Sequence, residues 1–137
     1  MLSSFYMTTI KLDFTELFQP DLKDNKKALV NGIYAVFSCT DNPFKVKELL
    51  YIGQAQDQTI KERHSKHEDL QKWEQKCSKG ERLTYAFCQV EKKYIDDVEA
   101  ILIKCNDPVC NEQHPNIKDK NLKLEISGCC KEIVKTN

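Results

Sequence analysis

The sequence predicts an α/β fold of the α+β type, in which a small, mainly antiparallel three-stranded sheet is flanked by helices. Three segments rich in β-branched and aromatic residues have the length and composition of strands, at 28–39, 48–55 and 83–90. Two further segments, 59–76 and 94–105, repeat apolar residues at helical spacing. The expected order is therefore strand, strand, helix, strand, helix, with the first two strands forming a hairpin.

Length and composition indicate one globular domain. A chain of 137 residues can bury a single core, and its 40% apolar and 31% charged residues are typical of a soluble protein. We expect a central domain at 28–115, with extensions at 1–27 and 116–137 packed on it. No apolar run approaches the about 18 residues of a membrane span, and no basic-then-apolar leader begins the chain. We therefore expect a cytoplasmic protein with no membrane contact.

The N-terminal half contains the predicted hairpin. Residues 8–18 alternate loosely and are expected to form an outer strand or a docked arm. The hairpin follows, with a turn at 40–47 that contains Asn42 and Pro43 between its two strands. Either Asp57 or Thr59 is expected to cap the first helix.

The C-terminal half completes the sheet and adds the second helix. The first helix continues to about Lys76 and ends before Gly80, after which the third strand begins. Pro108 ends the second helix, because proline cannot continue an α-helix. Residues 122–126 alternate and are expected to form an edge strand, whereas 128–137 carry no clear pattern.

The cysteines indicate packing in a reducing compartment. Their number is odd and no two have Cys-x-x-Cys spacing, so we interpret several of them, which have apolar neighbours, as small buried hydrophobic residues. A zinc site assembled from distant segments is the alternative, and it would make the chain a zinc-binding adaptor. The seven are Cys39, Cys77, Cys88, Cys105, Cys110, Cys129 and Cys130.

Two tripeptides fall on the two strands of the predicted hairpin, just ahead of the first helix. They are Gly32-Ile33-Tyr34 and Tyr51-Ile52-Gly53. Either tripeptide alone is weak evidence, since any strand that meets a turn can carry glycine beside isoleucine and tyrosine. The pair gains meaning from the residues that follow it.

Four polar residues follow in a fixed order. Arg63 lies early in the first helix, His67 one turn later, Glu99 within the second helix and Asn111 shortly after it. Together with the two tripeptides, this order resembles the signature of the GIY-YIG nuclease family. The resemblance covers about residues 28–115, and it implies a GIY-YIG-like core.

The resemblance also implies an activity, a metal-dependent endonuclease that hydrolyses DNA phosphodiester bonds with one Mg²⁺ or Mn²⁺ ion. Glu99 is the implied metal ligand, Arg63 would hold a non-bridging phosphate oxygen, and Asn111 would position Glu99 or a metal-bound water. Where some members of the family carry lysine after the second tripeptide, this chain has Gln54. The implied catalytic set is Tyr34, Tyr51, Arg63, His67, Glu99 and Asn111.

The role of general base has two candidates. The resemblance implies Tyr34 as the base that activates water, Tyr51 as a ligand of the phosphate or the water, and His67 as the group that accepts or shares the proton. A tyrosine pKa near 10 leaves about one phenol in a thousand ionised at pH 7, so activation needs roughly 4 kcal/mol. His67 acting directly as the base is the alternative, because its ordinary pKa already suits the task.

Helical spacing independently places Arg63 and Glu99 beside apolar faces. Arg63 projects near the middle of the stripe that includes Trp73, and Glu99 lies next to the buried face of the second helix. A charge among apolar side chains is costly unless it has a partner. An Arg63–Glu99 ion pair of purely structural value is the alternative to a metal site, and the tyrosines would then be ordinary packing residues.

The charge balance bears on the expected partner. Lys plus Arg equals Asp plus Glu at 21 each, so the chain has no global positive field to attract DNA. Only segment 61–79 has a modest excess of cations. We therefore expect contact with the DNA phosphate backbone to be weak and to benefit from a targeting protein partner. A nucleic-acid-binding or protein-interaction module without strong catalytic activity is the alternative.

Overall fold

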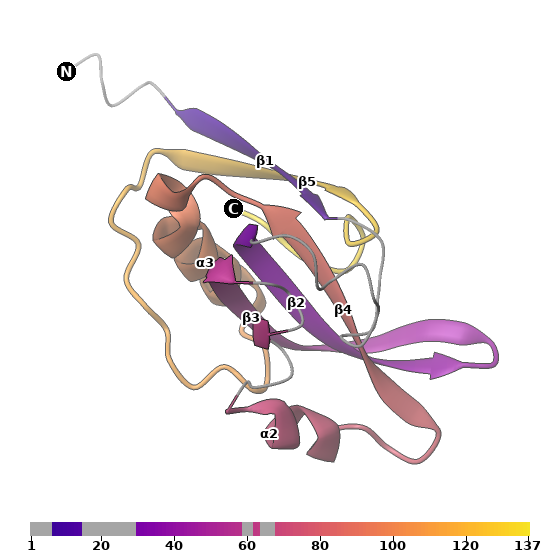
Figure 1. The fold of residues 1–137 in the computed structure, drawn as a ribbon. Coiled ribbons are helices and arrows are strands. Elements are labelled where there is room, and N and C mark those ends of the chain that lie inside the picture. The colour runs from indigo at the N-terminus through magenta and orange to yellow at the C-terminus, as the bar shows by residue number, and fades with distance from the viewer. Residues whose placement is uncertain (1–6, 15–29, 59–61, 64–67) are drawn as a thin grey trace.

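The computed structural model of this protein describes residues 7–14, 30–58, 62–63 and 68–137. Within them, an antiparallel three-stranded sheet is accompanied by helices and a second, smaller sheet, which confirms the predicted α+β class (Figure 1). The elements are β1 (Thr8–Phe14), β2 (Val30–Asp41), β3 (Phe44–Gln58), α2 (Leu70–Gln75), β4 (Glu81–Gln89), α3 (Lys92–Asn106) and β5 (Leu122–Gly128).

The three-stranded sheet has the order β3-β2-β4, and both of its strand pairs are antiparallel. Its strands and α3 lie where the sequence predicted them, within a few residues. The turn predicted at 40–47 is wrong in length, because β2 and β3 stay paired up to Asp41 and Phe44 and leave only Asn42 and Pro43 between them. Figure 1 shows the resulting hairpin projecting away from the rest of the molecule.

The two outer strands pair with each other. β1 and β5 form a separate parallel two-stranded sheet with Thr8 opposite Leu122, which confirms the predicted outer strands at Thr8–Phe14 and Leu122–Gly128. Residues 15–18 of the first prediction lie outside the described residues. The pair packs beside β4 (Figure 1). Apolar residues at alternate positions, such as Leu12 and Leu124, face the core and the residues between them face solvent.

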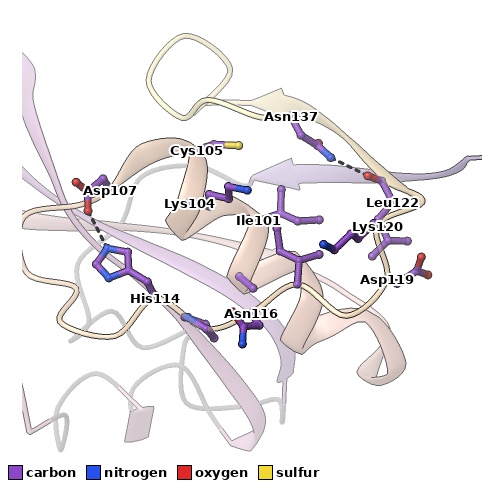
Figure 2. Close-up of a pocket in the computed structure, with 13 residues that line it drawn as sticks. Ile101, Lys104, Cys105, Asp107, His114, Asn116, Asp119, Lys120, Leu122 and Asn137 are labelled. Atoms are coloured by element: carbon purple, nitrogen blue, oxygen red, sulfur yellow. Dashed lines mark hydrogen bonds and ion pairs between the residues drawn. The ribbon is translucent and has the colours of Figure 1, made fainter.

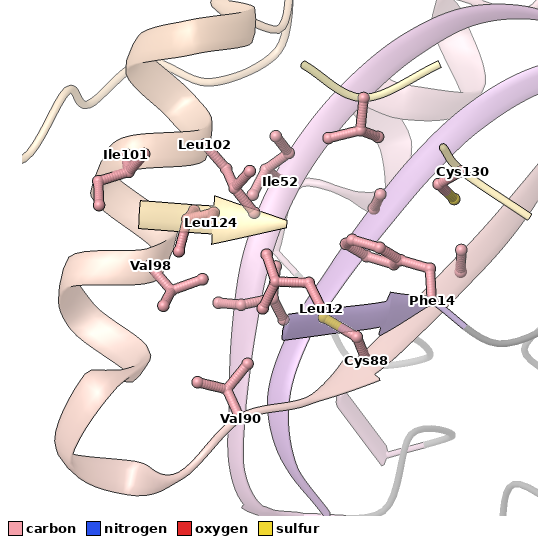
Figure 3. Close-up of a cluster of buried hydrophobic side chains, with 14 of the residues drawn as sticks. Leu12, Phe14, Ile52, Cys88, Val90, Val98, Ile101, Leu102, Leu124 and Cys130 are labelled. Atoms are coloured by element: carbon pink, nitrogen blue, oxygen red, sulfur yellow. The ribbon is translucent and has the colours of Figure 1, made fainter. Parts of the chain in front are cut away.

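Hydrophobic side chains cover both faces of the three-stranded sheet. On one face, Leu12 and Phe14 of β1 and Leu124 of β5 join the apolar side of α3 (Figure 3). The buried residues of α3 are Ile95, Val98, Ala100, Ile101, Leu102 and Ile103. On the other face, Tyr34, Val36, Trp73 and Tyr85 form a second cluster. Alternation along β2 therefore sends Tyr34 to the face opposite α3.

The first predicted helix is interrupted. Glu62 and Arg63 are helical, but Glu68 and Asp69 form a turn before α2 begins at Leu70, so one continuous helix is wrong. The predicted cap Asp57 lies in β3, where its carboxylate accepts hydrogen bonds from Lys92 and Asn31. Thr59 lies outside the described residues.

All seven cysteines lie in the described part of the chain, and no disulfide joins any two of them. Four are buried, namely Cys39, Cys88, Cys110 and Cys130. No helix in the described ranges is long and apolar enough to cross a membrane.

Candidate active site

The strand register places the two tripeptides side by side. Tyr34 of β2 lies directly opposite Gly53 of β3, and Gly32 lies opposite Ala55. A Cβ atom on Gly53 would lie 2.4 Å from the Tyr34 hydroxyl oxygen, and one on Gly32 would lie 1.9 Å from the Cys88 carbonyl oxygen. Glycine at both positions is therefore required by close packing, whatever chemistry the site performs.

Aromatic rings surround Tyr34. Its ring stacks on that of Tyr51 with centroids 6.1 Å apart and meets Trp73 edge-on at 6.5 Å. The Arg63 guanidinium carbon lies 5.5 Å from the centre of the Tyr34 ring, within the range of a cation–π contact. Tyr34 is fully buried, whereas Tyr51 and Arg63 are half-buried. The sequence placed Trp73 only on an apolar stripe, and its contact with both tyrosines was missed.

Both phenols are held in their protonated form. Burial raises the pKa of Tyr34 well above its ordinary value, and the Arg63 guanidinium offsets only part of that rise. Burial also raises the pKa of Tyr51 to about 12, with Asp69 and Glu99 adding to the increase. At neutral pH and without added positive charge, neither phenol is ionised.

Gln54, the residue after the second tripeptide, connects Arg63 to the second helix. Arg63 Nε donates to the Gln54 carbonyl oxygen at 2.9 Å. The side-chain amide of Gln54 donates to Glu99 Oε1 and to Asp96 Oδ1, each at 3.0 Å. Sequence analysis noticed Gln54 only as a departure from a lysine and missed its contact with Asp96. The three-residue spacing of Asp96 and Glu99, which puts them on neighbouring turns, was the available signal.

Glu99 is a half-buried carboxylate that accepts a hydrogen bond from the neutral side chain of Gln54. Burial raises the pKa of Glu99, the hydrogen bond from Gln54 opposes that rise, and the neighbouring Asp96 adds to it. Arg63 lowers the pKa of Glu99 only as the smallest of the four influences. No direct ion pair joins Arg63 and Glu99 in the part of the chain described here; Gln54 mediates the connection.

Asn111 is bound to the backbone of the second tripeptide. Its Oδ1 accepts a hydrogen bond from the Ile52 N–H and its Nδ2 donates to the Ile52 carbonyl, both at 2.9 Å. Next to it, the Cys110 N–H donates to the Leu50 carbonyl at 2.8 Å. The chain after α3 thus hydrogen-bonds to backbone groups on the outer edge of β3, as a further strand would. Asn111 holds the strand that carries Tyr51.

The structure thus brings Tyr34, Tyr51, Arg63 and Glu99 into one electrostatically connected site, with Asn111 bound to its β3 backbone. His67, the remaining predicted residue, lies outside the described residues.

The residues present fit a divalent ion with few protein ligands. Magnesium is usually bound by one or two carboxylates together with substrate phosphates and waters. Glu99 supplies one such carboxylate at the edge of the buried region. Among the described residues, no three His, Cys, Asp or Glu side chains gather closely enough to hold a metal by themselves.

A groove of about 900 Å³ lies apart from these residues (Figure 2). It is bounded by the last turns of α3, residues 114–120 and the start of β5. None of the predicted catalytic residues lines it. Its His114 is paired with Asp107 at 2.8 Å.

Comparison with protein-family models, curated proteins and solved structures finds no match to this chain.

Proposed function

We propose that this chain is a metal-dependent endonuclease of the GIY-YIG type that hydrolyses DNA phosphodiester bonds. The observation that carries the proposal is the connection from Tyr34 through Arg63 and Gln54 to Glu99. It brings together two phenols from β2 and β3, a half-buried carboxylate from α3 and a guanidinium from the helical residues at 62–63. Ordinary packing does not require that combination, because each buried or half-buried charge costs free energy.

Each residue of the site has its own role in the proposed reaction. The planar guanidinium of Arg63 is suited to hold non-bridging oxygens of a phosphate. Tyr51, half-buried beside it, offers a hydroxyl to the phosphate or to the attacking water. Glu99 would hold the divalent ion, whose chemistry when bound is to neutralise the phosphoryl oxygens and assist the departing 3′ oxygen. Asn111 keeps the strand of Tyr51 in place.

Tyr34 is assigned as the general base, with His67 as the alternative. Its position beneath Arg63 supports the assignment, because a neighbouring guanidinium favours the ionised phenol. Its burial opposes it, because a base must reach water. Opening of the site around Tyr34 is therefore part of this mechanism.

A plasmid assay tests the activity. Supercoiled DNA incubated with the purified chain and Mg²⁺ or Mn²⁺ should be nicked, and chelation should stop the reaction. Glu99→Gln should abolish nicking, whereas Glu125→Gln, at an exposed position of β5, should leave it unchanged. If no metal, protein excess or low salt yields nicking, the proposal fails.

The charge balance favours one second candidate, a nucleic-acid-binding or protein-interaction module derived from such a nuclease. With 21 cations and 21 anions, the chain has no overall field to attract DNA, which fits reliance on a targeting partner. Retardation of DNA in a gel without any cleavage would select the nucleic-acid-binding form of this candidate.

A further inference from the structure

Gln54 lies between the guanidinium of Arg63 and the carboxylates of α3. Its backbone carbonyl accepts from Arg63 Nε, and its side-chain amide nitrogen contacts both Glu99 and Asp96. The side-chain oxygen of Gln54 is itself engaged, since Gln56 Nε2 donates to it at 2.5 Å. Every polar group of the Gln54 side chain thus has a defined partner, and the amide is fixed in one orientation.

Two carboxylates on one face of a helix repel each other. Asp96 and Glu99 are three residues apart on α3, and the charge of Asp96 raises the pKa of Glu99. The Gln54 amide nitrogen lies 3.0 Å from an oxygen of each, so its two N–H groups compensate part of both charges. The neutral amide of Gln54 therefore compensates the two negative charges less fully than a bound cation would.

Resting on the proposed function, we infer that Gln54 is a positioning residue that holds the Glu99 carboxylate until a divalent cation takes over its charge. The amide and the cation compete for the same carboxylate oxygen, so the hydrogen bond that orients Glu99 also weakens metal binding. Gln54 therefore sets both the orientation of the metal ligand and the metal concentration that the site requires.

Two substitutions at Gln54 make opposite predictions. Gln54→Ala removes the competing donor, so metal should bind severalfold more tightly, while the maximum cleavage rate should fall by about tenfold because Glu99 is no longer oriented. Gln54→Lys places an ammonium against the two carboxylates, so metal should bind severalfold more weakly. A residue that only supports the fold would lower stability in both variants without moving metal affinity in opposite directions.

The experiment measures thermal stabilisation of the purified chain as Mn²⁺ is added, alongside plasmid nicking. Gln113→Ala, at an exposed loop position, serves as the matched control and should behave as wild type in both assays. The Mn²⁺ concentration for half-maximal stabilisation should fall in Gln54→Ala and rise in Gln54→Lys. Equal midpoints in all four proteins, or no stabilisation of wild type by Mn²⁺, would overturn the inference.

The outcomes separate this inference from the proposed function. If wild type binds Mn²⁺ with the expected shifts at Gln54 but never cleaves DNA, the role of Gln54 stands and the nuclease fails. If wild type cleaves DNA and the Gln54 variants match it in Mn²⁺ midpoint and rate, the nuclease stands and Gln54 has no such role.

Discussion

Replacement of Asn111 by alanine should destabilise the protein and thereby impair the site. The change removes two 2.9 Å hydrogen bonds and leaves the N–H and C=O of Ile52 without their partner. Each partly buried backbone group so exposed costs about 1–2 kcal/mol, so unfolding free energy should fall by about 2–4 kcal/mol. At about 2.1 cal/mol/K per residue over 137 residues, Tm should fall by about 7–14 °C.

Thermal melts without metal measure this effect, with Asn116→Ala as the control. Asn116 is an exposed asparagine of the following loop, so its loss should change Tm by less than about 2 °C. Asn111→Asp keeps the acceptor for the Ile52 N–H and loses the donor, so its Tm should fall between those of wild type and Asn111→Ala. A Tm of Asn111→Ala within about 2 °C of wild type, combined with lost cleavage, would refute the reasoning and give Asn111 a direct chemical role.

Three further predictions concern the residues around Tyr34. Glu99→Gln should have a metal-free Tm equal to or above that of wild type at pH 7–8. Burial raises the pKa of Glu99, so wild type loses stability as pH rises through that pKa, whereas the variant does not. The difference in Tm should therefore disappear as pH falls toward about 4. A large drop in Tm at neutral pH would instead show that the Glu99 carboxylate stabilises the fold through its connection by Gln54 to Arg63, as a structural group. Tyr34→Phe should slow nicking by at least about a hundredfold if Tyr34 is the base, and near-normal nicking would transfer that role to His67. Gly53→Ala should cost about 1–3 kcal/mol in urea unfolding, because its Cβ would lie 2.4 Å from the Tyr34 hydroxyl, and an unchanged midpoint would contradict that packing.

Local sequence pattern predicted the strands and the second helix. The β-rich, apolar composition of residues 28–39 predicted β2, and the helical repeat in 94–105 predicted α3 with Ile95, Val98 and Leu102 in the core. Composition and helical spacing are properties of one segment, so a single sequence displays them directly. The order of the site residues came instead from the resemblance to the GIY-YIG family, because burial periodicity does not mark catalytic residues.

Features that depend on contacts between distant segments could not be predicted from the sequence. The parallel pairing of β1 with β5 joins segments more than 100 residues apart, and periodicity does not reveal which strand neighbours which. Gln54 carries no charge and lies on no periodic face, so its contacts with Asp96 and Glu99 required the structure. The helix predicted through Glu68 and Asp69 failed because apolar spacing on both sides of a turn resembles one longer repeat.

The burial of the tyrosines limits how the site can generate a base. Each tenfold change in ionisation corresponds to about 1.4 kcal/mol, so a phenol with a pKa of about 12, as at Tyr51, costs about 7 kcal/mol to ionise at pH 7. The Arg63 guanidinium lowers the pKa of both phenols, yet both remain above their ordinary value. Because Tyr34 is the more deeply buried, it needs more additional positive charge than Tyr51. A tyrosine base in this fold therefore requires a second cation near Glu99, whereas a histidine base does not. Metal-free protein should for that reason have no ionised tyrosine at this site at neutral pH, and the choice between Tyr34 and His67 reduces to whether the base needs that cation.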